Sequence, residues 1–241
     1  EAITIGDGVF RDFYGIEHIN IHDEITSIGH EAFKNCGSLT SIAIPDSVKS
    51  IGSGIFAGCT SLKSISLGVN IDSINKEMFT GCDSIEQFSG KFASEDGYTI
   101  VSNGMLIAFA KACGLQEYTI SANITHIEDR VFANCTNISL FRFESTTPPT
   151  LGANVFAGID NLQISIPKEA VEAYLTCDWP YDYRRAIIEL ADINNIPDSC
   201  RIYYTTNDNK KLDVYPDDGY TVLSHDYSNG QGIIVFFEPL T

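Results

Sequence analysis

A repeat of 23 residues is the feature that most constrains how this chain folds. The segment ITSIGHEAFKNCGSLTSIAIP at residues 25–45 returns as VKSIGSGIFAGCTSLKSISLG at 48–68 and as IDSINKEMFTGCDSIEQFSG at 71–90. A phenylalanine marks the same slot at intervals of 23 or 24 residues, interrupted once, at Phe10, Phe33, Phe56, Phe79, Phe132 and Phe156. A unit this short cannot bury its apolar face alone, so the repeat predicts a stacked array of coils.

Each copy contains one short run of the form L-x-x-I-x-I, in which apolar residues alternate as they do in a strand. Seven such runs are found, at residues 16–21, 39–44, 62–67, 85–90, 115–120, 138–143 and 162–166. We therefore predict an α/β repeat solenoid with the architecture of a leucine-rich repeat. It would be a right-handed coil array with about seven short parallel strands, spaced about 4.8 Å apart.

One coil is longer than the others. The 53 residues from Phe79 to Phe132 exceed two periods by seven. The segment YTIVSNGMLIAFA within this coil has two alternating apolar runs around Asn103 and Gly104. Asn-Gly tolerates the positive φ angles of a tight turn, so we predict a β-hairpin at about residues 98–109 that bulges from the array.

The repeat ends after Pro167. In the segment KEAVEAYLTCDWPYDYRRAIIEL, apolar residues follow a helical spacing and Trp179 adds bulk, which predicts a helical cap over the last coil. From about residue 191 the β-type runs CRIYYTT, KLDVY, TVLSHDY and GIIVFFE alternate with turn clusters. We predict two domains, a repeat array with its cap at 1–190 and a small β-rich spacer module at 191–241.

Four of the seven cysteines share one slot of the repeat. Cys36, Cys59, Cys82 and Cys135 each follow the repeat phenylalanine by three residues, a slot that holds Phe13 or Ile159 in other coils. We interpret them as small core residues, with pairing between neighbouring coils as the alternative. The sequence leaves open whether Cys113, Cys177 and Cys200 are paired or free.

The repeat signature I-x-x-I-G-x-x-A-F-x-x-C-x-x-L-x-x-I-x-I-P, complete at residues 25–45, resembles the BspA-like leucine-rich repeats of bacterial surface proteins. The lengthened coil, with the wording SEDGYTIVSNGMLIAF, is similar to a variant coil of such proteins from Bacteroides-type bacteria. The resemblance covers residues 1 to about 190. It implies export to the cell surface, an extracellular location and a role in adhesion or recognition.

Charge excludes some classes of partner. The chain has 15 Lys and Arg against 32 Asp and Glu, a net charge of -17. No basic run is present that could follow a phosphate backbone or an anionic membrane, so we expect no nucleic-acid partner and no membrane insertion by this segment. We expect either a monomer or a section of a longer modular polypeptide.

Five residues are candidates for binding a partner. His18 and His22 lie on the first predicted strand, Tyr98 and Met105 on the lengthened coil, and Arg142 on the sixth strand. The apolar hairpin residues, Met105 among them, either pack on the coil below or contact a ligand. His18 and His22 lack a third ligand in a neighbouring coil, so we predict no metal site.

No motif for a nucleophile, phosphate cradle or cofactor is present. We therefore predict a non-enzymatic recognition or adhesion module without a cofactor. It would bind an extracellular protein or glycan through the concave face and the hairpin coil. Two alternatives remain, a structural stalk that displays another domain and an accessory binding domain of a larger surface enzyme.

Overall fold

The computed structural model describes residues 2–188, 201–205, 222–228 and 231–236. The chain divides into two compact units. Unit 1 comprises Glu1–Gln116, Ile124–Ile138 and Leu151–Ile159, and unit 2 comprises Glu117–Asn123, Ser139–Thr150 and Asp160–Thr241.

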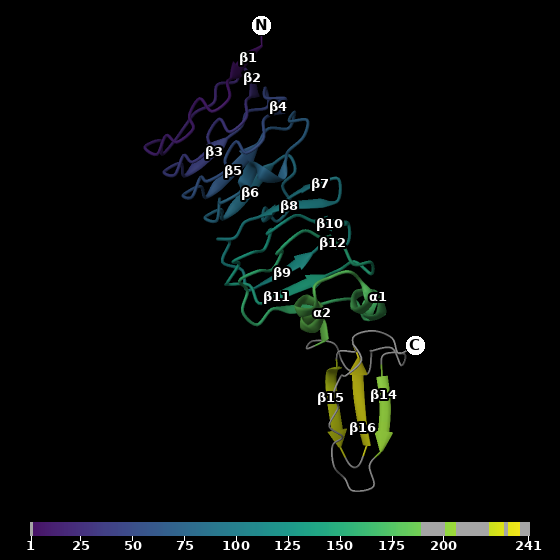
Figure 1. Cartoon of the computed structure of the whole chain (residues 1–241). Coiled ribbons are helices and arrows are strands. Elements are labelled where there is room, and N and C mark those ends of the chain that lie inside the picture. Colours follow the sequence, from purple (N-terminus) through teal and green to yellow (C-terminus); the bar gives the residue numbers. More distant parts are fainter. Residues whose placement is uncertain (1, 189–200, 206–221, 229–230, 237–241) are drawn as a thin grey trace. The chain divides into compact units, whose positions relative to one another are not determined.

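The repeat places short parallel strands side by side in unit 1 (Figure 1). One sheet has the order β1-β2-β4, from β1 (Ile3–Ile5), β2 (Ile25–Ile28) and β4 (Ser50–Ile51). A second sheet has the order β3-β5-β6, from β3 (Ser41–Ala43), β5 (Ser64–Leu67) and β6 (Gln87–Gly90). Ser41 is in register with Ser64, and Ser64 with Gln87. Each step along this sheet is therefore one period of the sequence.

The repeat phenylalanines form a column in the core of these coils. The ring centroids of Phe10 and Phe33 lie 5.4 Å apart, those of Phe33 and Phe56 5.8 Å, and those of Phe56 and Phe79 6.4 Å, all stacked. Phe33 and Phe56 are almost completely buried. Stacked rings at this separation add to the stabilisation from burial, so the column fixes the register of one coil on the next.

The glycine of the I-G pair permits the same close stacking. A Cβ atom on Gly52 would lie 2.4 Å from the backbone nitrogen of His30 and 2.6 Å from the carbonyl carbon of Gly29. No side chain fits at that distance. The glycine is therefore required by the approach of one coil's backbone to the preceding one.

The predicted hairpin is confirmed by β7 (Thr99–Ser102) and β8 (Met105–Phe109), which pair antiparallel. Asn103 and Gly104 at the turn have φ angles of 51° and 77°. The hairpin does not simply bulge from the array, because β8 also pairs in parallel with β10 (His126–Ile127). The sheet has the order β12-β10-β8-β7, with β12 at Thr150–Leu151.

Phe109 continues the aromatic column through the lengthened coil. It is buried, and its ring centroid lies 5.0 Å from that of Phe132. Phe132 in turn stacks on Phe156 at 5.4 Å. Leu106, Ile107 and Ala108 are also buried. These four hairpin residues, Leu106 to Phe109, therefore pack in the core and are not exposed to a ligand.

Unit 2 carries the last strands and the helical segment. Its parallel sheet has the order β13-β11-β9, from β9 (Glu117–Ile120), β11 (Leu140–Phe143) and β13 (Gln163–Ser165). The helices are η2 (Lys168–Ala170), α1 (Val171–Thr176) and α2 (Tyr181–Ile188). An antiparallel sheet has the order β14-β16-β15, from β14 (Arg201–Thr205), β15 (Val222–Ser228) and β16 (Gln231–Phe236).

The predicted cap is confirmed by an aromatic cluster in unit 2. The Trp179 ring lies 5.1 Å from that of Phe143 and 5.2 Å from that of Tyr174. Trp179 Nε1 donates to the carbonyl oxygen of Pro149 at 2.8 Å, and the Tyr174 hydroxyl donates to that of Ser145 at 3.0 Å. Both polar tips are therefore satisfied while their rings cover apolar residues.

The solenoid of parallel strands is confirmed, with differences in detail. Six predicted strands are present as β3, β5, β6, β9, β11 and β13. The first, at 16–21, is reduced to a bridge between His18 and Ser41. The described coils return mainly through turns, with one short 3-10 helix, η1 (Lys76–Phe79). The predicted domain boundary at 190/191 and the β-type run at 211–215 lie outside the described residues.

The column predicts a large cost for removing one ring. We expect Phe56→Ala to lower the free energy of unfolding by about 3 to 5 kcal/mol, because it leaves a cavity between two stacked rings. Chemical denaturation measures this loss. Val69→Ala is the matched control, since Val69 is 60% exposed and its truncation should change stability by less than about 0.5 kcal/mol. Equal effects of the two substitutions would contradict the column.

Candidate functional site

The outward face of the β3-β5-β6 sheet is polar and built from small side chains. Because successive side chains of a strand point to opposite faces, Ile42, Ile65 and Phe88 enter the core and their neighbours point outward. We call this outward set the strand face: Ser41, Ala43, Ser64, Ser66, Gln87 and Ser89. It offers hydroxyl and amide groups to a partner rather than large apolar anchors.

Two adjoining hollows lie on the strand face and share Ser41 and Ser64. The first has a volume of about 340 Å³ and includes His18 and Ile19 in its lining. The second, which we call the Tyr98 hollow, has a volume of about 530 Å³. The strand ends contribute Thr40, Ser41, Lys63, Ser64, Glu86 and Gln87 to it, and the lengthened coil contributes Tyr98, Ala112 and Cys113.

The lengthened coil holds Tyr98 beside the last strand of the sheet. The Phe88 N–H donates to the carbonyl oxygen of Gly97 at 2.7 Å, which places this segment along the edge of β6. Asp96 Oδ1 accepts the N–H of Tyr98 at 2.9 Å, and the Tyr98 carbonyl accepts the N–H of Ala110 at 2.8 Å. Tyr98 is half-buried against the core. The backbone on both sides of this ring is therefore fixed.

The charges that line the Tyr98 hollow are balanced. Lys63 Nζ lies 3.1 Å from Glu86 Oε1, and the two side chains are 61% and 52% exposed. An ion pair this exposed contributes little stability. The pair instead offers a ligand one donor, the Lys63 ammonium, and one acceptor, the Glu86 carboxylate, with no net charge.

The structure brings two of the five sequence-predicted residues onto one surface. His18 lines the first hollow, with its Nδ1 atom 3.4 Å from the Thr40 hydroxyl, and Tyr98 lines the second. His22 is exposed, accepts the N–H of Glu24 on Nδ1 at 3.3 Å, and lines neither hollow.

The other two predicted residues lie on different sheets. Met105 is 37% exposed and is in register with His126, in the sheet that contains the hairpin. Arg142 is on β11 in unit 2, where its Nη2 atom lies 3.1 Å from Glu117 Oε2. Both residues remain predictions as binding positions, and neither lines the hollows of the strand face.

The sequence-based prediction missed a row of residues that the structure brings to the Tyr98 hollow. Thr40, Lys63 and Glu86 each precede an outward strand position, and they follow one another at the repeat interval. This spacing was the signal that could have identified them. Cys113 carried no such signal, because it lies outside the cysteine slot of the repeat.

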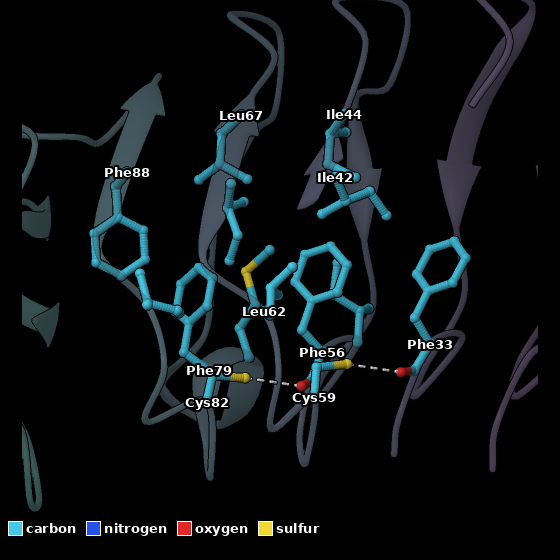
Figure 2. Packing of buried hydrophobic residues seen from close by; sticks show 14 of the residues in the cluster. Phe33, Ile42, Ile44, Phe56, Cys59, Leu62, Leu67, Phe79, Cys82 and Phe88 are labelled. Atoms are coloured by element: carbon cyan, nitrogen blue, oxygen red, sulfur yellow. Dashed lines mark hydrogen bonds between the residues drawn. The ribbon is translucent and has the colours of Figure 1, made fainter. Parts of the chain in front are cut away.

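The repeat cysteines are buried thiols that tie neighbouring coils together. The S–H groups of Cys59 and Cys82 donate to the carbonyl oxygens of Phe33 and Phe56 at 3.1 and 3.0 Å (Figure 2). Cys36 donates to the Phe10 carbonyl in the same way, at 3.1 Å. Burial raises the pKa of Cys59 and that of Cys135 to about 12. These thiols therefore stay protonated and unreactive at neutral pH.

The six cysteines of the described region are all free, which confirms the core interpretation of Cys36, Cys59, Cys82 and Cys135 and excludes pairing between coils. Cys113 and Cys177 are half-buried free thiols, with pKa values raised by desolvation. Cys200 lies outside the described residues.

Within the described ranges, no three His, Cys, Asp or Glu side chains cluster as a metal site would require. The longest described helix has eight residues, and none is long and apolar enough to span a membrane.

The parallel strands, the 23-residue register and the aromatic column define a leucine-rich-repeat solenoid. Six copies of the BspA type leucine rich repeat region match residues 1–96 and 106–176. The chain therefore belongs to the family of BspA-type leucine-rich repeat proteins.

A solved structure agrees with this fold. A leucine-rich repeat protein from Bacteroides ovatus is similar with a TM-score of 0.50 and 23% identity, over 69% of this chain and 52% of that one. A leucine rich cell surface protein from Faecalibacterium prausnitzii has a TM-score of 0.47 and 20% identity over the same shares. The chain thus spans about half the length of these two proteins. No curated protein matches it in sequence.

Burial of the repeat thiols predicts their labelling. We expect Cys36, Cys59, Cys82 and Cys135 to resist alkylation in the native protein and to react fully in denaturant without reductant. Cys113 and Cys177 should react slowly in the native state, because they are half-buried. Peptide mapping by mass spectrometry measures each site separately. Repeat cysteines that stay unlabelled in denaturant would indicate disulfides.

The raised thiol pKa values also predict a loss of stability at alkaline pH. The pKa of Cys59 is about 12 in the folded chain, against an ordinary value of 9.0. At a pH between these two values, the Cys59 thiol is deprotonated in the unfolded chain and protonated in the folded chain. The free energy of unfolding therefore falls as pH rises, by up to about 1.4 kcal/mol per pH unit for each such thiol. Below pH 9 this contribution is fully present.

Cys59→Ala should lessen that fall. Denaturant midpoints of wild type and variant, taken under reducing conditions between pH 8 and 10.5, measure the difference in slope. The variant is expected to be less stable at pH 8, because the buried Phe33 carbonyl loses the thiol donor and keeps only the N–H of Cys36. It should also lose less stability on going to pH 10.5. Parallel pH profiles would show that Cys59 does not carry this dependence.

Proposed function

We propose that this chain is a non-enzymatic recognition module that acts outside the cell and binds a protein or glycan partner on the strand face. The observation that carries the proposal is the shape of that face. A regular row of small polar side chains is walled at one end by the lengthened coil, which sets the half-buried Tyr98 beside Gln87.

The family supports the proposal in two respects. Proteins built from leucine-rich repeats are generally not catalytic, and their stacked strands form extended binding surfaces. The BspA-type repeats of this chain resemble those of bacterial surface proteins, which supports an extracellular location. His18 and Tyr98 are the predicted residues best placed to contact a partner, since both line hollows of the strand face.

The small size of the strand-face side chains favours a second candidate, a stalk that displays another domain. Binding energy at interfaces is concentrated in large anchors such as Trp, Tyr and Arg. Of these, Tyr98 alone lines the two described hollows. A stalk would need no partner on this face.

A binding panel with a blocked strand face separates the two candidates. Extracellular matrix proteins, mucins and glycans would be tested by surface plasmon resonance at physiological salt. We expect Ser64→Arg/Ser66→Arg to weaken the bound partner at least tenfold, because two long charged side chains cover β5. Ser50→Arg/Ser73→Arg is the matched control, with the same added charge at exposed positions away from the strand face.

Binding that survives the strand-face variant would contradict the proposed surface. A folded protein that binds nothing in the panel would favour the stalk. Thermal unfolding of both double variants checks that each remains folded.

A further inference from the structure

We infer that the Tyr98 hollow binds a neutral oligosaccharide. This inference deepens the proposed function, since it assigns a ligand class to part of the strand face. It rests on the unused hydrogen-bonding groups of the hollow, its balanced charge, its one aromatic ring and its size.

Four polar side chains of the hollow make no hydrogen bond within the described chain. Within the described part of the chain, the hydroxyls of Ser41 and Ser64 and the side-chain amide of Gln87 have no hydrogen-bond partner, and neither does the phenol oxygen of Tyr98. Each of these groups can both donate and accept. A sugar hydroxyl has the same dual capacity, so a ring with several hydroxyls can satisfy neighbouring groups of this kind at once.

Charge favours a neutral ligand over an acidic one. Lys63 and Glu86 neutralise each other across 3.1 Å, so the hollow has no uncompensated cation. The chain as a whole has a net charge of -17, which repels polyanions. Sialylated or sulfated glycans would therefore be repelled at long range. Their acidic groups could pair with Lys63 only by displacing Glu86.

Tyr98 supplies the apolar surface that hydroxyl-rich ligands also need. A tyrosine ring offers a rigid amphipathic contact at low cost in conformational entropy. Here the backbone beside the ring is already held by Asp96, Ala110 and, through Gly97, by β6. The C–H face of a sugar can pack on such a ring while its hydroxyls contact Gln87 and Ser64.

The volume indicates the length of the ligand. About 530 Å³ lies within the range of small-molecule sites. The adjoining hollow adds about 340 Å³ and shares Ser41 and Ser64 with the first. A ligand that leaves the Tyr98 hollow would continue across β3 and β5 toward His18, which favours a chain of several sugars over a single one.

Cys113 provides a reporter of occupancy because its half-buried thiol lines the hollow. The full chain would be alkylated at pH 8.5 with and without maltohexaose, cellohexaose and lacto-N-tetraose at millimolar concentration, and each cysteine followed by mass spectrometry. We expect at least one of these neutral probes to slow alkylation of Cys113 severalfold. Cys177, which does not line the hollow, is the internal control and should keep its rate.

Substitutions at Tyr98 test the same contact by calorimetry. Tyr98→Ala should weaken binding of the protecting oligosaccharide at least tenfold, and Tyr98→Phe, which retains the ring, should weaken it less. Tyr14→Ala is the matched control, because Tyr14 is 64% exposed and lies outside the hollow. Sialyllactose should neither bind nor protect Cys113.

Three results would overturn the inference. These are no protection of Cys113 by any neutral probe, protection by sialyllactose alone, and protection by a protein from the binding panel in place of a sugar. After the last result, the proposed function would still hold if Ser64→Arg/Ser66→Arg weakens binding of that protein at least tenfold. Failure of the saccharide inference is thus distinguishable from failure of the proposed function.

Discussion

Register between neighbouring coils depends on one buried column of phenylalanine rings. Centroid separations of 5.4 to 6.4 Å between Phe10 and Phe79 leave no room for a coil to slide on its neighbour. The cysteine three residues later reinforces this register, because its thiol donates to the phenylalanine carbonyl of the preceding coil. Cysteine suits the slot because it is small and apolar and still supplies a second donor to a buried carbonyl oxygen.

The lengthened coil obeys the same constraint. Phe109 follows Phe79 by 30 residues but precedes Phe132 by the usual 23, and its ring packs on that of Phe132. The seven extra residues are therefore accommodated before the column resumes, in the segment that carries Gly97 and β7. That segment runs along β6, at the edge of the strand face. The insertion thus reshapes a surface and leaves the core periodic.

Much of the fold could be predicted because the repeat is local and strict. Strand positions followed from the L-x-x-I-x-I runs, the hairpin from Asn103 and Gly104, and burial of the cysteines from their shared slot. The place of Phe109 in the column was missed, because its segment was assigned to the hairpin alone. The pair Ala108-Phe109 matches Ala32-Phe33 of the repeat and was the available signal.

The candidate site was less predictable, because it depends on contacts outside the period. Tyr98 lines the same hollow as Gln87 because the Phe88 N–H donates to the Gly97 carbonyl, and no pattern in the sequence predicts that bond. Met105 and Tyr98 were both predicted as binding candidates on the lengthened coil, but Met105 does not line the hollow. It lies instead on β8, which joins the sheet of β10. Strand alternation accounts for the outward serines, but only the path of the inserted segment decides where the strand face is hollowed.

Separation of the column from the strand face has a consequence for specificity. Outward side chains such as Ser64 and Ser66 contribute little to the core, so their substitution costs little stability. A repeat array can therefore change these positions freely, but small side chains on a regular sheet offer a partner no enclosed contact. The inserted segment supplies that contact by placing an aromatic ring and a half-buried thiol at the end of the row. Under the proposed function, specificity on this face would depend on a departure from the repeat. The insertion leaves the aromatic column intact, so the core tolerates that departure.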